Sequence, residues 1–261
     1  MNTSVLRSDW DSTQTTIETL DLLPYEGKKK FAIVLHNICT PQECQDFIRI
    51  SEENGYEQAL VNVGGGRQCS MTDIRNNDRS IIDDPVTAEI LWQRILLAYQ
   101  HDTNLLHAPW VGTGLFAVGI NERLRFLRYD PGTYFTQHYD GSYRRGNEAG
   151  ESRCGETSYV TMQLYLNEGF EGGATSFSKF GSATSPNRLD VIPRTGSVLL
   201  FEHHCSHEGA VLISGRKYAI RSDVMYTTKG DQETYALKPI SLNKVLEPPP
   251  LEKKKKRPSN T

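Results

Sequence analysis

Residues 215–226 read GRKYAIRSDVMY, and the alternation of side chains in this stretch decides the expected fold. Residues two apart in a β-strand point to the same side. One side is mostly apolar and suits packing against neighbouring structure: Tyr218, Ile220, Val224 and Tyr226. The other side puts charges at internal positions of the strand: Lys217, Ala219, Arg221, Asp223 and Met225. Because an unpaired buried charge is costly, these cations need an anion, which is either a bound acid or, for Arg221, the nearby Asp223.

Other short, β-rich segments are separated by Gly, Pro, Asn or Ser, and they cover residues 31–38, 124–129, 159–167 and 196–201. Several short strands at this spacing favour a sandwich or barrel. Two helices are also expected. Thr40, Pro41 and Glu43 form a capping box at the start of the first helix, and Gly55 stops it. The second helix, over residues 83–100, also begins with an aspartate and a proline. The predicted architecture is mainly β with flanking α-helices.

The composition is that of an ordinary soluble globular protein, with 261 residues, 37% hydrophobic and 23% charged. No apolar run is long enough to span a membrane, and the polar N-terminus lacks the pattern of a signal peptide. The five cysteines are odd in number and form no CxxC pair, which favours a reducing, intracellular compartment. We expect one domain over residues 29–228, after a polar lead-in (1–28) and before an extended tail (229–261).

The net charge of −3 is unevenly distributed along the chain. The last ten residues carry +4, which leaves −7 on the rest. An acidic body argues against general nucleic-acid binding. The basic run Lys253–Arg257 is either a solvated tail or a nuclear localisation signal, so the expected location is cytoplasmic or nuclear. No coiled-coil heptads occur, and the oligomeric state stays open.

Residues 135–146, FTQHYDGSYRRG, contain a histidine and an aspartate two positions apart, His138 and Asp140. On one side of a strand they would present an imidazole and a carboxylate to the same point. A second histidine would complete the two-histidine, one-carboxylate ligand set of non-haem Fe(II) oxygenases. The segment FEHHCSHEG offers three candidates, His203, His204 and His207.

Three segments together carry a family resemblance: RYDPGTYFTQHYD (128–140), MQLYLNEGFEGGATSF (162–177) and HEGAVLISGRKYAIRSDVMY (207–226). The sequence over roughly residues 30–228 resembles the prolyl 4-hydroxylase-like branch of the Fe(II)/2-oxoglutarate-dependent dioxygenases. The resemblance implies a double-stranded β-helix, or jelly-roll barrel, buttressed by N-terminal helices. It also implies Fe(II), 2-oxoglutarate as cosubstrate, and ascorbate as a reductant.

In that branch, a basic residue ten positions after the distal histidine holds the C5 carboxylate of 2-oxoglutarate. His207 and Lys217 have this spacing, so the resemblance assigns His138, Asp140 and His207 to iron and Lys217 to 2-oxoglutarate. It adds further candidates for the cosubstrate pocket: Tyr129, Tyr165, Thr175 of the Gly-Gly turn and, on the face of Lys217, Arg221. Core packing is the alternative for the two tyrosines. Halogenating relatives lack the carboxylate, so Asp140 implies hydroxylation.

The leading interpretation is a hydroxylase of a peptidyl residue, with proline as the target and succinate and CO₂ as coproducts. The second is a hydroxylase of a free amino acid or other small metabolite, and the third is a non-catalytic barrel that only binds a ligand. Two polar segments are expected to be lids that select the substrate. Their arginines would recognise an acidic peptide or a small carboxylate, or would only be solvated: Arg67, Arg75 and Arg79 in 64–80, and Arg144, Arg145 and Arg153 in 141–158.

Overall fold

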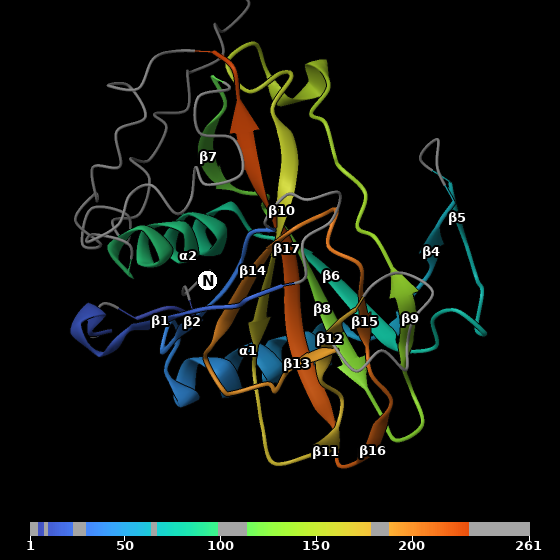
Figure 1. The fold of residues 1–261 in the computed structure, drawn as a ribbon. Helices are drawn as coiled ribbons and strands as arrows, with labels where there is room; N and C mark the ends of the chain where they lie inside the picture. The colour runs from blue at the N-terminus through green and yellow to red at the C-terminus, as the bar shows by residue number, and fades with distance from the viewer. Residues whose placement is uncertain are drawn as a thin grey trace, which may run out of the picture.

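The computed structural model describes residues 5–7, 10–22, 30–63, 67–98, 114–178 and 188–229. This part of the chain is mainly β with two α-helices, and its antiparallel sheets are consistent with the expected jelly roll (Figure 1). The expected tail, with its basic run, lies almost entirely outside the described residues. No helix among those described is long and apolar enough to cross a membrane.

The larger sheet has nine strands and is antiparallel throughout. Its order is β1 (Thr16–Thr19), β2 (Ala32–His36), β14 (Val198–Glu202), β10 (Thr157–Tyr165), β17 (Lys217–Thr227), β8 (Arg123–Tyr129), β6 (Asp78–Asp83) and β3 (Glu57–Gln58). Strand β7 (Phe116–Ile120) also pairs with β17. The predicted strand 216–226 therefore lies in the middle of the sheet, between β10 and β8.

The smaller sheet has four antiparallel strands, in the order β13 (Leu189–Val191), β12 (Thr175–Phe177), β15 (His207–Gly209) and β9 (Phe135–His138). Two further pairs are β11 (Glu171–Gly172) with β16 (Leu212–Ser214), and β4 (Val61–Asn62) with β5 (Gln68–Cys69). Short 3₁₀ turns cover η1 (Ser12–Gln14) and η2 (Asn147–Ala149).

Alternate residues of the large sheet pack on its two faces. Along β2, Ile33 and Leu35 join a core cluster with residues of both helices, whereas Ala32 and Val34 join a second cluster. The second cluster includes Phe177 and Val191 of the small sheet. The helices therefore pack on one face and the small sheet on the other, as strict alternation requires.

Helix α1 (Pro41–Asn54) begins as predicted. Thr40 Oγ1 accepts from the Glu43 amide at 3.2 Å, and Glu43 Oε2 accepts from the Thr40 amide at 2.8 Å, which completes the capping box. Gly55 follows with φ of 85°. Helix α2 (Pro85–Ala98) is tied to α1 by a fully buried ion pair, with Arg94 Nη2 2.7 Å from Glu43 Oε1.

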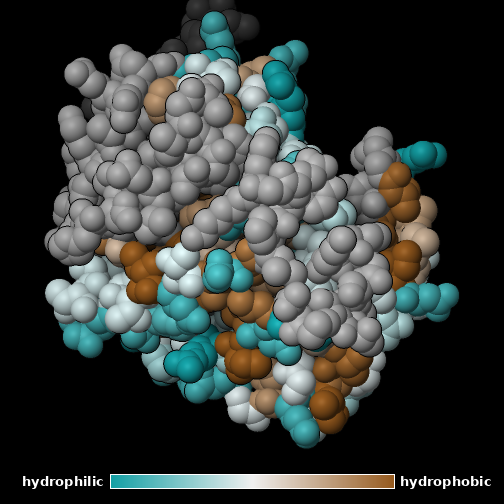
Figure 2. All heavy atoms as spheres, in the orientation of Figure 1, coloured by the Kyte–Doolittle hydropathy of each residue, from teal (hydrophilic) through white to brown (hydrophobic). Residues whose placement is uncertain are grey.

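Two segments differ from expectation. The polar composition of residues 1–28 predicts no strand, but β1 pairs with β2 at the edge of the large sheet. The composition of residues 64–80 predicts a loop, but β5 and the first residues of β6 are strands. The described surface seen in Figure 2 mixes hydrophilic and hydrophobic side chains.

Candidate iron and 2-oxoglutarate site

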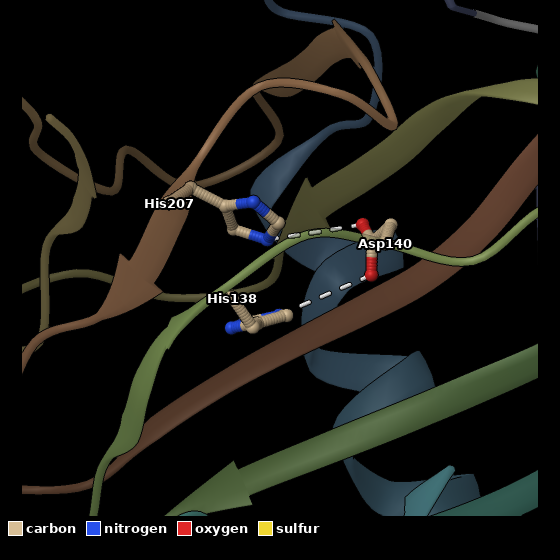
Figure 3. Close-up of side chains that lie close together, drawn as sticks. All are labelled: His138, Asp140 and His207. Atoms are coloured by element: carbon tan, nitrogen blue, oxygen red, sulfur yellow. Dashed lines mark ion pairs between the residues drawn. The ribbon is translucent and has the colours of Figure 1, made fainter. Parts of the chain in front are cut away.

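Two neighbouring strands of the small sheet bring two histidines together. His138, the last residue of β9, pairs in register with His207, the first residue of β15, and the ring centroids lie 4.2 Å apart. Asp140 follows β9 by two residues and turns its carboxylate towards both rings (Figure 3). Its Oδ1 lies 3.9 Å from His138 Nε2, and its Oδ2 lies 3.7 Å from His207 Nε2. One candidate ligand atom from each residue falls within 4.8 Å of the others.

Hydrogen bonds to the backbone fix which nitrogen of each histidine faces the cluster. His138 Nδ1 lies 2.7 Å from the Thr136 carbonyl, and His207 Nδ1 lies 3.0 Å from the Cys205 carbonyl. A carbonyl oxygen can only accept, so both Nδ1 atoms carry the proton and both Nε2 lone pairs are available. Burial lowers the pKa of His207, and burial, together with the repulsion that a protonated His207 would exert, lowers that of His138 to about 3. Both rings are therefore neutral at neutral pH, as metal ligation requires.

Asp140 is held by groups on both of its oxygens. Thr161 Oγ1 donates to Oδ2 at 2.5 Å, and Arg221 Nη2 lies 3.1 Å from Oδ1. Burial alone would raise the pKa of Asp140, but Arg221 and the neighbouring imidazoles outweigh it and hold the pKa well below its usual value. The cluster thus offers two neutral nitrogens and one carboxylate, the donor set that binds non-haem Fe(II).

Replacing Thr161 with valine is expected to weaken metal binding by about tenfold, because hydrogen bonds that orient a ligand typically contribute that much affinity. Valine keeps the shape of threonine but leaves Asp140 Oδ2 without its donor. Titration of Mn(II), followed by electron paramagnetic resonance, measures the effect. Thr161→Ser, which retains the hydroxyl, should restore affinity, and equal affinity for valine and serine variants would contradict the role of the bond.

Lys217 lies in the same pocket, which has about 390 Å³ of empty space and is lined by both histidines and Asp140. The lysine is 1% exposed, and its Nζ donates to the Gly173 carbonyl at 2.5 Å. The ammonium also lies 5.0 Å from the ring centre of Tyr129 and 5.6 Å from that of Tyr165. Within the described part of the chain, no carboxylate pairs with it. Burial lowers the pKa of Lys217 to about 7, so the lysine needs an anion to stay charged at higher pH.

Tyr165 and Gln163 lie on the same side of β10 as Thr161. Tyr165 Oη and Gln163 Nε2 both donate to Thr175 Oγ1, at 2.8 and 3.1 Å. The Thr175 hydroxyl proton then remains to be donated elsewhere. The preceding Gly-Gly turn has to be glycine, because Gly173 has φ of 66° and a Cβ there would lie 2.9 Å from Leu212 Cδ1. This turn carries the carbonyl that Lys217 contacts, and Thr175, which follows the turn, lines the pocket together with Lys217.

Arg221 lines the pocket, but the structure pairs it with carboxylates of the protein. Its Nη2 lies 3.1 Å from Asp140 and 3.0 Å from Asp223 Oδ1, so the predicted alternative of an Arg221–Asp223 pair is present. The other two candidate histidines lie outside the cluster. His203 Nε2 is buried 3.3 Å from Asp223 Oδ1, and His204 is exposed. Sequence reasoning did not identify Thr161 as the partner of Asp140; its signal was the polar side of β10.

Half of the arginines of the two expected lids are already paired. Arg79 pairs with Glu57, Arg145 with Glu122 and Glu156, and Arg153 with Glu122. Arg67 and Arg144 are exposed. Because their charges are matched within the protein, Arg79, Arg145 and Arg153 are poor candidates for substrate recognition.

Residues 124–222 match the model of the 2OG-Fe(II) oxygenase superfamily. The match spans all three candidate metal ligands, Lys217 and the pocket residues of β8, β10 and β12. It confirms the resemblance seen in the sequence motifs. Residues 124–222 therefore have the sequence features of the 2-oxoglutarate-dependent dioxygenases, a class of enzyme that uses Fe(II) and 2-oxoglutarate.

The solved structures it resembles include the viral collagen prolyl hydroxylase of Paramecium Bursaria Chlorella virus-1, with 19% identity, 77% of this chain and 97% of that chain covered, and a TM-score of 0.46. A prolyl-4-hydroxylase from Pseudomonas putida has 17% identity, coverage of 80% and 91%, and a TM-score of 0.48. A Trichoplax adhaerens prolyl hydroxylase, in complex with a hypoxia inducible factor peptide, has 16% identity, coverage of 88% and 91%, and a TM-score of 0.47. No curated protein sequence matches the chain.

Proposed function

We propose that this chain hydroxylates a peptidyl residue, with proline as its target, and releases succinate and CO₂ from 2-oxoglutarate. The observation that carries the proposal is the convergence of two neutral histidine nitrogens and one carboxylate beside a buried lysine that has no anionic partner among the residues the structure describes. His138, Asp140 and His207 would hold Fe(II). Lys217 would hold the C5 carboxylate of 2-oxoglutarate, and the ten-residue spacing between His207 and Lys217 supports the prolyl 4-hydroxylase-like assignment.

When bound, iron supplies the oxidation chemistry, and the residues of the chain set its surroundings. The Thr136 and Cys205 carbonyls hold the two imidazoles with Nε2 towards the site. Arg221 keeps Asp140 ionised. The rings of Tyr129 and Tyr165 lie near the Lys217 ammonium, and Thr175 lines the same pocket, so that a carboxylate there would replace water with fixed donors. The two sheets would form the double-stranded β-helix, braced by α1 and α2, with residues 29–228 as the catalytic domain.

A free amino acid or another small metabolite is the second candidate substrate. It is favoured by cationic side chains near the pocket, where Arg221 lines the cavity and Arg75 stacks on Phe135. A small carboxylate would satisfy such cations as readily as an acidic peptide.

Incubation with Fe(II), 2-oxoglutarate and ascorbate is expected to convert a proline peptide to a product 16 Da heavier, with one succinate formed per product. Mass spectrometry of a panel of proline peptides and free amino acids measures this. Reactions without 2-oxoglutarate are the control. Hydroxylation of free amino acids alone would replace the peptide assignment by the second candidate, and succinate formation that no panel member stimulates would contradict both.

A further inference from the structure

Arg75 is held beside the candidate iron site by backbone pairing. It forms a β-bridge with Phe135 of β9, and the Thr136 amide donates to the Ile74 carbonyl at 2.9 Å. The guanidinium lies 4.6 Å from the centre of the Phe135 ring, on which it stacks as a cation on an aromatic face. The Phe135 ring in turn stacks on His138, with centroids 3.6 Å apart. One aromatic ring therefore separates Arg75 from a candidate metal ligand.

The charge of Arg75 is not matched within the described part of the protein. Its Nε donates to the neutral Asn77 Oδ1 at 2.8 Å, and no described carboxylate lies within ion-pair distance. Neither Nη group has a partner among these residues, although the side chain is half-buried. Arg79, in the same segment, has Glu57 instead. Arg75 thus keeps a pair of parallel donors in the arrangement that matches a carboxylate.

Among the described residues, the cations around Arg221 also outnumber their anionic partners. Arg125 Nη1 lies 3.5 Å from Asp223 Oδ2, and Arg221 lies 3.0 Å from Oδ1 of the same carboxylate, so the two arginines share Asp223. Arg221 also contacts Asp140, but in the proposed site that carboxylate is a ligand of the dication. Glu208, which lines the pocket, is already paired with Arg188. An uncharged substrate would leave positive charge in excess here, and an anionic one would balance it.

We propose that Arg75 binds a carboxylate of the substrate, in a subsite next to the iron site on the far side of the Phe135 ring. The inference rests on the proposed function and restricts its substrate class: the hydroxylated molecule carries a carboxylate near its reacting carbon. Two sources present this group, an acidic residue beside the target in a peptide and the α-carboxylate of a free amino acid. Either carboxylate would bind the guanidinium of Arg75.

The test measures binding near the metal without turnover. The protein is loaded with Mn(II) and saturating 2-oxoglutarate, and broadening of probe proton signals by the paramagnetic metal is followed by nuclear magnetic resonance. The peptide arm compares acetyl-Gly-Pro-Asp-Gly-amide with its Asn counterpart. The amino-acid arm compares L-proline, L-leucine and L-lysine with their carboxamides. The enzyme variants are Arg75→Gln, Arg75→Lys and, as an exposed arginine in the other lid segment, Arg144→Gln.

In at least one arm, the wild type is expected to bind the carboxylate probe about tenfold more tightly than its amide, as a charge-assisted contact provides. Arg75→Gln should remove the difference, Arg75→Lys should keep part of it, and Arg144→Gln should behave as the wild type. The arm that responds identifies the source of the carboxylate. Equal binding of both members of every pair, no broadening of any carboxylate probe, or an undiminished preference in Arg75→Gln would overturn the proposal.

Failure of this inference is distinguishable from failure of the proposed function. The hydroxylation assay uses Fe(II) and detects a gain of 16 Da, whereas the binding assay uses Mn(II) and detects no product. Hydroxylation of uncharged probes alone would refute the carboxylate subsite and leave the hydroxylase standing. Carboxylate binding that depends on Arg75, without hydroxylation of any probe, would support the carboxylate subsite and refute the proposed hydroxylase.

Discussion

Replacing His207 with alanine or glutamine is expected to abolish iron-dependent succinate formation. His207 provides one of only two imidazole Nε2 atoms in the cluster, and its Nδ1 bond to the Cys205 carbonyl fixes the ring orientation. A site left with His138 and Asp140 lacks the third ligand of the facial set. Succinate formation and Mn(II) binding by electron paramagnetic resonance should both be lost.

Two controls separate metal loss from damage to the core. The His207 ring packs 4.6 Å from the Phe201 ring, so alanine leaves a cavity, and glutamine fills more of it. Thermal unfolding of the metal-free proteins shows whether each variant folds. His204→Gln, at an exposed position three residues away, should retain activity. Activity retained in the His207 variants but lost in His204→Gln would show that the distal ligand is wrongly assigned.

The fold was predictable where side-chain alternation and burial coincide. Ile220, Val224 and Tyr226 of β17 all join the core cluster that faces the helices, as the pattern in GRKYAIRSDVMY predicts. The pairing of β7 with β17 was not predictable in the same way: Met225 lies opposite Gly119 but Tyr226 lies opposite Ala117, and bulges of this kind leave no clear mark in a sequence. Strand β1 was not predicted either, because it has no buried side. All four of its residues are exposed, so backbone hydrogen bonds to β2 hold it without an apolar side.

The candidate site was predictable as a set of residue types, but its contacts were not. His138 and His207 are neighbours because β9 and β15 pair in the small sheet, which no local pattern reveals. The ten-residue spacing known from the family, rather than a physical argument, favoured His207 over His203 as the distal ligand. The partners of Asp140 illustrate the limit further. Thr161 and Arg221 come from adjacent strands of the other sheet, and only the packing of the two sheets places them on one carboxylate.

Replacing Lys217 with alanine or methionine is expected to weaken 2-oxoglutarate binding about ten- to a hundredfold, because a charge-assisted contact contributes roughly 1.5–3 kcal/mol. Affinity for the metal alone should barely change, since the lysine contacts the Gly173 carbonyl rather than a candidate ligand. Titration of 2-oxoglutarate into the Mn(II)-loaded proteins measures the first affinity, and titration of Mn(II) into the metal-free proteins measures the second. Arg221→Ala is the comparison: its Cα lies about 13 Å further along the strand, at ~3.3 Å per residue, so both side chains cannot serve one carboxylate equally.

The pH dependence of 2-oxoglutarate affinity provides a second, independent readout of Lys217. Burial lowers the pKa of the free lysine to about 7, and a bound carboxylate would raise it again. Below pH ~7 the lysine is already charged, so affinity should be flat; above it, binding requires proton uptake, and affinity should fall by up to about tenfold per pH unit. Lys217→Met has no proton to take up, and its affinity should not follow this slope. Two results would show that Lys217 does not hold the carboxylate. One is a wild-type affinity for 2-oxoglutarate that stays constant from pH 7 to 9, and the other is a large loss of this affinity in Arg221→Ala with none in Lys217→Met.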